Sequence, residues 1–217
     1  MKLAPLVLGL LASTGLTACS HTSQGPAQTG VAPAPADHAA HTSTAPAAAS
    51  NGGRYTEADV QFMSGMIAHH AQAVLIAGWA PTHDASPSLR ALCERIVVGQ
   101  KDEIAFMQNW LRDRNQEVPS GDTAHARMPG MEHHMLMPGM LTADQLNQLD
   151  RAKGVEFDSL FLQGMIRHHQ GALTMVSQLF GTPGAAQDDL MFKFASDMNA
   201  DQTIEIERMN KMLAALP

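Results

Sequence analysis

The feature that most constrains the fold of this chain is an internal repeat. Residues 65–74 read GMIAHHAQAV and residues 164–173 read GMIRHHQGAL, an offset of 99. A second pair of segments, QKDEIAFM at residues 100–107 and QTIEIERM at residues 202–209, matches at an offset of 102, so the second copy carries three extra residues. The chain is therefore a duplicated helical hairpin. Two amphipathic hairpins most simply bury their apolar faces together, which predicts an all-α four-helix bundle.

Local signals predict where the helices begin. Thr56 and Asp59 form a capping box, Ser86 is an N-cap followed by a proline, and Thr142 opens a second capping box. No stretch alternates with period two for long enough to form a strand. The predicted helices span about 56–79, 86–114, 142–154, 155–180 and 186–216. The folded domain is predicted at 54–217, with repeat halves at about 56–114 and 142–216 and a connector at 115–141.

The N-terminal region is typical of an exported lipoprotein. Residues 1–18 carry one charged residue, Lys2, before an apolar run that is too short to span a bilayer, which is typical of a signal peptide. The segment LTAC, which ends at Cys19, resembles a bacterial lipobox and implies a lipid on that thiol; cleavage as a simple secreted protein is the alternative. Residues 19–53 are rich in Ala, Pro, Ser and Thr and predict a disordered tether. We expect a membrane-anchored protein of the bacterial cell envelope that faces the periplasm or the exterior.

Charge and cysteine content exclude two other classes of protein. The formal net charge of -7 leaves no basic footprint for nucleic acid. A lipidated Cys19 leaves Cys93 without an intramolecular partner, so the fold is not a disulfide scaffold and its core must come from packing. Cys93 lies on an apolar helix face and is predicted to be a small core residue.

The apolar stripes of the predicted helices carry polar and sulfur-containing residues. At 100° per residue, both histidines of each copy lie on the same face as the methionine three residues before the first of them. The partner helices turn a glutamine inward and place a glutamate on the shoulder of the same face. The inward-facing candidates are Met63, Met66, His69, His70, Met165, His168, His169, Gln100, Glu103, Gln202 and Glu205.

Buried polar groups at these positions must be satisfied, because each one left unpaired costs roughly 1–3 kcal/mol. One solution is a hydrogen-bonded network in which Glu and Gln hold the histidines and set the helix register. The other is a metal bound by histidine and methionine, with Glu or Gln orienting the rings. The spacing alone leaves both solutions open.

The connector favours the metal. Of the 15 methionines and 11 histidines in the chain, several crowd into the segment HARMPGMEHHMLMPGM, where a Pro- and Gly-broken sequence makes a core role for Met improbable. Thioethers bind Cu(I) well and imidazole accepts Cu(I) or Cu(II), so this composition selects copper. The candidate ligands in the connector are Met128, Met131, His133, His134, Met137 and Met140.

At these residues the chain resembles the domain of unknown function 305 family. The resemblance covers about 56–216 and rests on the two GMIxHH stretches, MPGMLT at residues 137–142 and the paired QxxEIxxM segments. It implies a ferritin-like four-helix fold, an extracytoplasmic location and, in some members, copper binding through Met and His. Leu162 stands where the first copy has Met63, which argues against an equal metal site in each half.

Together these observations predict a lipid-anchored protein that captures and buffers copper, with Cu(I) preferred and Cu(II) possible, for copper homeostasis or tolerance. A protein that delivers copper to it is a possible partner. No residue is predicted to be catalytic. One alternative is a structural or interaction lipoprotein with a metal-free His–Glu–Gln network. A weaker alternative is a di-metal redox enzyme, although neither copy contains the Glu-x-x-His motif of such centres.

Overall fold

A computed structural model describes residues 55–121 and 136–217. The described residues form helices and no strand, which confirms the predicted all-α class. The helices are α1 (Glu57–Ala77), α2 (Pro87–Asp113), α3 (Ala143–Arg151), α4 (Gly154–Gly181) and α5 (Asp189–Ala214), with a short 3-10 turn at Ala80–Thr82.

The helices begin where the capping residues predicted. Thr56 and Asp59 form a reciprocal capping box at α1, and Thr142 does the same with Gln145 at α3. Ser86 accepts a hydrogen bond from the first turn of α2, which opens with a proline. These caps satisfy backbone N–H groups that have no partner within the helix, so each start is specified locally.

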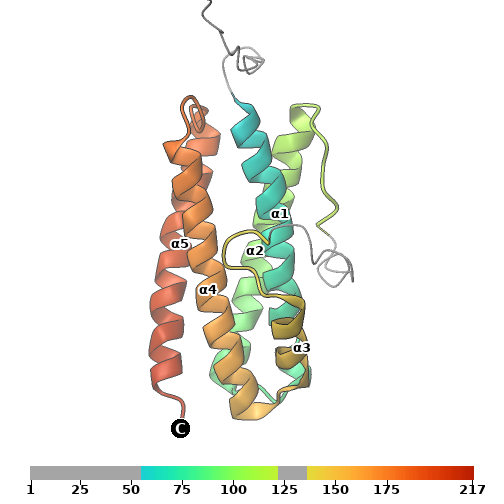
Figure 1. Ribbon diagram of the computed structural model, residues 1–217, viewed down its shortest axis with the longest axis vertical. Helices are drawn as coiled ribbons and strands as arrows, with labels where there is room; N and C mark the ends of the chain where they lie inside the picture. The colour runs from blue at the N-terminus through green and yellow to red at the C-terminus, as the bar shows by residue number, and fades with distance from the viewer. Residues whose placement is uncertain (1–54, 122–135) are drawn as a thin grey trace, which may run out of the picture. The chain divides into compact units, whose positions relative to one another are not determined.

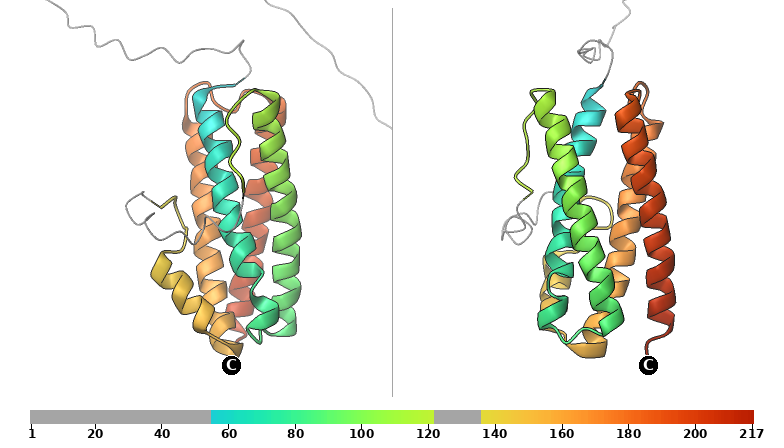
Figure 2. Two further views of the ribbon diagram at one scale, coloured as in Figure 1. Left: turned by 90° about the vertical axis from the view of Figure 1, so that its right-hand side faces the viewer. Right: turned by 180° about the vertical axis from the view of Figure 1, so that it is seen from behind.

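The four long helices pack as two hairpins. α1 packs against α2, α4 packs against α5, and the hairpins meet through α1 and α4, which run antiparallel (Figure 1). Between α2 and α5, the rings of Phe106 and Phe194 stack with their centroids 4.3 Å apart. α2 and α5 face the viewer when these helices are seen from behind (Figure 2). The short helix α3 lies against α4.

The hydrophobic core is divided into two clusters. One contains Ile76 near the end of α1 together with Phe157 and Phe161 near the start of α4. The other contains Phe62 and Ile67 from the start of α1, together with residues from the end of α4. Along α4 the histidine pair falls between the residues of one cluster and those of the other, and along α1 it does so with the exception of Val74, which follows the pair but packs with Phe62 and Ile67. The antiparallel packing therefore places a polar layer at the middle of an apolar interior.

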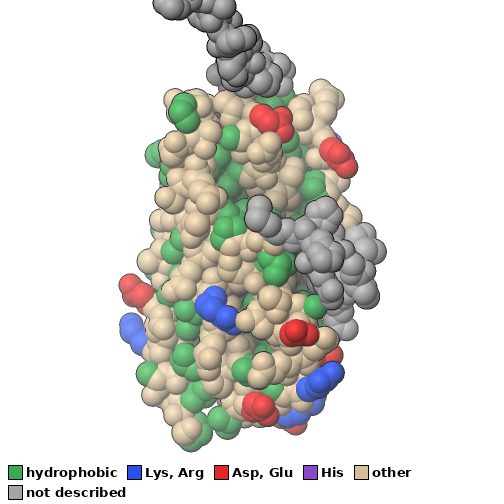
Figure 3. Space-filling view, viewed as in Figure 1, with side chains coloured by type: hydrophobic (Ala, Val, Ile, Leu, Met, Phe, Trp, Pro, Cys, Tyr) green, Lys and Arg blue, Asp and Glu red, His purple; other side chains and the backbone are tan. Residues whose placement is uncertain are grey.

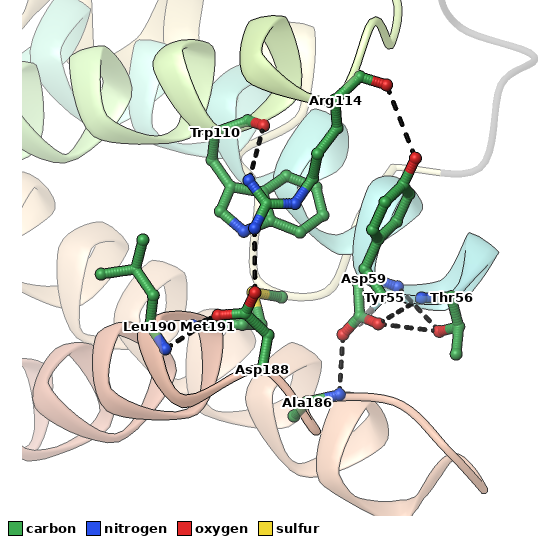
Figure 4. Close-up of polar contacts among 9 residues, drawn as sticks. All are labelled: Tyr55, Thr56, Asp59, Trp110, Arg114, Ala186, Asp188, Leu190 and Met191. Atoms are coloured by element: carbon green, nitrogen blue, oxygen red, sulfur yellow. Dashed lines mark hydrogen bonds and ion pairs between the residues drawn. The ribbon is translucent and has the colours of Figure 1, made fainter. Parts of the chain in front are cut away.

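Each hairpin contributes one buried carboxylate that accepts a hydrogen bond from the loop of the other hairpin. The Asp59 carboxylate accepts a hydrogen bond from the backbone N–H of Ala186, in the α4–α5 loop, at 2.7 Å (Figure 4). Asp158 occupies the equivalent position in the second copy and accepts from the N–H of Ser86, in the α1–α2 loop, at 3.2 Å. The repeat therefore preserves a tie between the hairpins as well as the histidine pair.

The Arg114 side chain links α2 to α5 at the end of the bundle that contains Asp59 (Figure 4). The Arg114 guanidinium lies 4.1 Å from the centroid of the Trp110 ring and donates to the Asp188 carboxylate at 2.9 Å (Figure 4). Asp188 in turn accepts from the first turn of α5, so one carboxylate caps α5 and holds α2. This contact links the C-terminal end of α2 to the N-terminal end of α5.

Several predicted features fall outside the described residues. They are the signal sequence, the lipidated Cys19, the tether and the connector ligands Met128, Met131, His133 and His134. Among the helices of residues 55–121 and 136–217, none has the length and apolar character to cross a membrane. Acidic and basic side chains are interspersed on the face shown in Figure 3.

Candidate metal centre

The two histidine pairs meet in the polar layer. His69, His70, His168 and His169 are at most 1% exposed. The rings of His69 and His168 lie with their centroids 3.8 Å apart, whereas the rings within each pair are 6.4 and 6.2 Å apart. The contact between the two copies is therefore closer than the contact within either pair. It follows from the antiparallel packing of α1 on α4, which brings position 69 level with position 168.

The second histidine of each pair is held by a glutamate from the partner helix. His70 Nε2 lies 2.7 Å from a carboxylate oxygen of Glu103, and His169 Nε2 lies 2.7 Å from a carboxylate oxygen of Glu205. The glutamate side chains are 25% and 22% exposed, so each carboxylate joins a buried imidazole to the solvent. Each glutamate therefore contacts a histidine ring, and the predicted role of the two glutamates in orienting metal ligands stays a prediction.

The first histidine of each pair is held by a backbone carbonyl. His69 Nε2 donates to the Pro138 carbonyl at 2.9 Å, and His168 Nε2 donates to the His69 carbonyl at 3.0 Å. A carbonyl oxygen only accepts, so the hydrogen of each of these rings is on Nε2. The Nδ1 atom of a neutral ring then carries a lone pair.

The Nδ1 atoms of the four histidines are unpaired in the part of the chain that the structure describes. Within the described residues, nothing hydrogen-bonds to the buried Nδ1 atom of any of the four histidines, or to the buried Oε1 atoms of Gln100 and Gln202. The glutamine oxygens were predicted to face the interior, and they do, but they do not hold the rings. The interior thus contains unpaired acceptors, whose burial is costly unless a donor or a cation satisfies them.

Burial keeps the two central rings uncharged. Burial, followed by the charge that His70 would carry, lowers the pKa of His69 to about 3. Burial and the neighbouring His69 and His169 lower the pKa of His168 well below its ordinary value. Both imidazoles are therefore neutral at physiological pH. Neutral imidazole is the form that binds metal ions.

The predicted methionines flank the histidine layer on both sides. Met63 and Met66 are fully buried in the cluster at the start of α1, while Met165 is fully buried in the other cluster. Met66 and Met165 therefore belong to different core clusters. From the connector, the Met137 sulfur lies 3.2 Å from the place that a Cβ on Gly65 would occupy.

Two other residues singled out in the sequence, Met140 and Cys93, lie in the connector and in the core. Met140 is half-buried in the connector. Cys93 is a buried core residue, and burial raises its pKa to about 12. A thiol that stays protonated is a poor metal ligand.

In the described part of the chain, no three or more His, Cys, Asp or Glu side chains are grouped so that they could hold a metal ion.

Sequence reasoning missed how the connector meets this layer. Gln72 accepts from the backbone N–H of Leu141 at 2.7 Å and donates to its carbonyl at 3.0 Å. The helix opposite has a glycine, Gly171, where a Cβ would stand 1.9 Å from the Pro138 oxygen. The offset of 99 aligns Gln72 with Gly171, and this difference between otherwise similar copies is the signal that could have revealed the contact.

These features define an all-α class of protein: two similar helical hairpins that enclose buried histidines between methionine-containing clusters. The chain belongs to the DUF305 family, whose description is "Domain of unknown function (DUF305)", because the family's sequence model matches residues 59–213. The predicted resemblance is therefore confirmed.

Solved structures of similar proteins share the fold. A DUF305 fragment from Deinococcus radiodurans is 26% identical, with a TM-score of 0.64, over 75% of this chain and 99% of that one. CopM in its Cu(II)-bound form is 29% identical, with a TM-score of 0.58, over 72% of this chain and 95% of that one. CopM has also been solved in Cu(I)-bound and silver-bound forms.

A curated relative matches over a shorter region. An uncharacterized protein of Acanthamoeba polyphaga mimivirus is 32% identical over 56 residues, which are 26% of this chain and 37% of that protein. The match thus spans little more than a third of the relative's length.

Proposed function

We propose that this protein binds copper within the histidine layer, preferentially as Cu(I), and buffers it. The observation that carries the proposal is the set of buried histidine Nδ1 atoms that have no hydrogen-bond partner among the described residues. Each belongs to a ring whose Nε2 lies against a carboxylate or a carbonyl. A hydrogen bond at one ring nitrogen, with the other left to the metal, is the usual arrangement of a ligating histidine.

The donor types favour copper over harder ions. Imidazole nitrogen and thioether sulfur suit Cu(I), whereas magnesium, calcium and manganese prefer oxygen ligands. The described residues group no three His, Cys, Asp or Glu side chains, so a ligand set drawn from them would combine imidazole with methionine sulfur. Met66, Met137 and Met165 are the candidates that flank the layer. CopM, which is similar in fold and sequence, has copper-bound structures and supports a copper-related role in this family.

The proposed setting is the bacterial cell envelope. A lipid on Cys19 would anchor the domain through the tether at residues 19–53. Copper would then be captured outside the cytoplasm and held or passed to a partner, for copper homeostasis or tolerance. The proposed role is binding and release of the metal.

Competition for Cu(I) against a chromogenic chelator tests this function. The wild-type protein should withdraw Cu(I) from the chelator, and a variant with Ala at all four layer histidines should not. His83→Ala is the matched control, because His83 is also buried but lies outside the layer, hydrogen-bonded to backbone carbonyls. Circular dichroism checks that each variant is folded. Failure of the wild type to bind Cu(I) refutes the function, and undiminished binding by the folded four-histidine variant refutes the site.

The structural alternative is favoured by one observation, the two short His–Glu contacts at 2.7 Å. If the layer only holds the helices together, copper leaves the melting temperature unchanged. If the native state binds copper, metal at about 100 times its Kd stabilises the fold by about 2.7 kcal/mol. Thermal unfolding with and without Cu(I) therefore separates the two functions.

A further inference from the structure

A short stretch of the connector lies against the histidine layer. Residues 136–141, here called the strap, cross between α1 and α4 at the level of the histidines (Figure 1). The Pro138 carbonyl accepts from His69, and the Met137 sulfur lies against Gly65. The strap thus contacts a histidine of the proposed site through its backbone and contacts α1 through a thioether.

The strap breaks the symmetry of the duplicated hairpins. His168 donates to the carbonyl of His69, so the symmetric partner of His69 would be the carbonyl of His168. His69 donates instead to Pro138, 69 positions along the chain. One central imidazole is therefore oriented by helix backbone, and the other by a connector that is not part of any helix.

The strap binds between α1 and α4 at a position where the two copies differ in sequence, with Gln72 in the first copy and Gly171 in the second. The Gln72 side chain on α1 makes two hydrogen bonds to the backbone of Leu141, accepting from its N–H and donating to its carbonyl. On α4, the absence of a side chain at Gly171 lets the Pro138 carbonyl approach the helix backbone. Gly139 has a φ of +78° and would carry a Cβ only 2.3 Å from the Arg167 carbonyl, so the strap itself also needs glycine there.

We propose that Gln72 is a positioning residue that holds the strap against α1 and α4, and that displacement of the strap is the step by which metal enters and leaves the half of the layer that contains His69. This inference rests on the proposed copper-binding function. His168 keeps its orientation while the strap is displaced, because its acceptor is a helix carbonyl. The two halves then differ in exchange rate although their sequences are similar.

The physical basis is a difference in local stability. The helices are held by continuous backbone hydrogen bonds and by the core. Residues 136–140 of the strap lie outside any helix and are held by the hydrogen bond from His69 and by packing of Met137 on one core cluster, while Leu141 anchors the C-terminal end of the strap in the other cluster. Segments with few buried apolar contacts open at lower free energy than core helices. Residues 137–140 are only half-buried, so their opening exposes little apolar surface as long as the Leu141 side chain stays in the core.

Gln72→Leu tests the role of Gln72, with Gln61→Leu as the control. Gln61 lies on the same helix, is exposed and donates a hydrogen bond to Glu57 of that helix. In the metal-free protein, Gln72→Leu should raise amide hydrogen exchange at Leu141 by about tenfold or more, since two hydrogen bonds are lost. It should also shift the ring 15N signals of His69 while leaving those of His168 unchanged. Gln61→Leu should change neither.

Gly171→Ala provides a second variant, in case Gln72→Leu does not fold. Alanine strengthens a helix but would place its Cβ 1.9 Å from the Pro138 oxygen, so the strap is displaced while α4 persists. Gly99→Ala is the matched control, because a Cβ at that helical glycine meets nothing within 4 Å. Gly171→Ala should shift the His69 ring signals, and Gly99→Ala should not.

Release of Cu(I) to a chromogenic chelator connects the strap to function. The wild-type protein should release metal in two phases, and both Gln72→Leu and Gly171→Ala should accelerate one phase by about tenfold or more. Cu(I) binding by the wild type with unaltered release in both folded variants overturns the inference and leaves the proposed function intact. Failure of the wild type to bind Cu(I) refutes the proposed function itself, whatever the His69 signals show.

Discussion

Replacing Glu205 by alanine separates a ligand-orienting role from a purely structural one. The Glu205 carboxylate lies 2.7 Å from His169 Nε2, and the imidazole is fully buried. The variant removes the acceptor and leaves a buried N–H without its partner. The change is chemically small and lies at the edge of the proposed site, so the fold should persist.

The magnitude follows from burial. An unsatisfied buried N–H costs about 1–3 kcal/mol, and the lower end applies here because water can reach a side-chain position that is 22% exposed. For a domain of this size, about 1 kcal/mol corresponds to a fall of roughly 2–4 °C in melting temperature. Loss of the group that orients a ligating histidine typically lowers metal affinity by about 10–100-fold. Expressed as a free energy, the loss of copper affinity should thus exceed the loss of about 1 kcal/mol in the stability of the metal-free protein.

Two measurements check this prediction. Urea unfolding of the metal-free protein gives the stability change, and Cu(I) competition gives the affinity change. Glu205→Gln should restore part of both, because an amide oxygen can still accept from Nε2. Glu207→Ala, at an exposed position on the same helix, should affect neither. If Glu205→Ala lowers stability but leaves Cu(I) affinity at the wild-type value, His169 is structural and the reasoning fails.

Three further predictions concern stability and reactivity. Asp59→Ala should cost about 2–3 kcal/mol in urea unfolding, because the buried N–H of Ala186 loses a charged acceptor at 2.7 Å; an unchanged midpoint would contradict the tie between hairpins. Burial lowers the pKa of His69 to about 3 and that of His168 well below its ordinary value, so below about pH 6.5 the unfolded chain binds protons that the folded chain does not. Stability of the metal-free protein should therefore be full above that pH and fall as pH drops toward 3, and His69→Leu should flatten this fall in a pH series of urea midpoints. Burial raises the pKa of Cys93 to about 12, so a thiol reagent should modify it only in the unfolded protein; rapid labelling of the native state would show that the residue is accessible.

Much of the fold was predictable because its determinants are local or repeated. The capping boxes at Thr56 and Thr142 specify helix starts through hydrogen bonds between residues three apart, and such contacts can be read directly from the sequence. The inward direction of His69 and His168 follows from the 3.6-residue period, and both are buried. The repeat indicated that two similar units share one interior.

The partners of the histidines were only partly predictable. Glu103 and Glu205 lie one helical turn from the inward glutamines, and each contacts a histidine ring. The glutamine oxygens have no partner within the described residues. Periodicity places a side chain on a face but does not determine how far it reaches or which of several neighbours it meets.

The sequence alone determined the class of the fold, the helix starts and the residues that face inward. Only the tertiary structure decided that His69 lies ring to ring with His168, and that the Pro138 carbonyl holds His69. These contacts join residues 69 to 99 positions apart, and their geometry depends on the antiparallel register of α1 on α4 and on the room that Gly171 leaves. A local pattern specifies hydrogen bonds within a turn, but packing across the interior is a property of all the helices together.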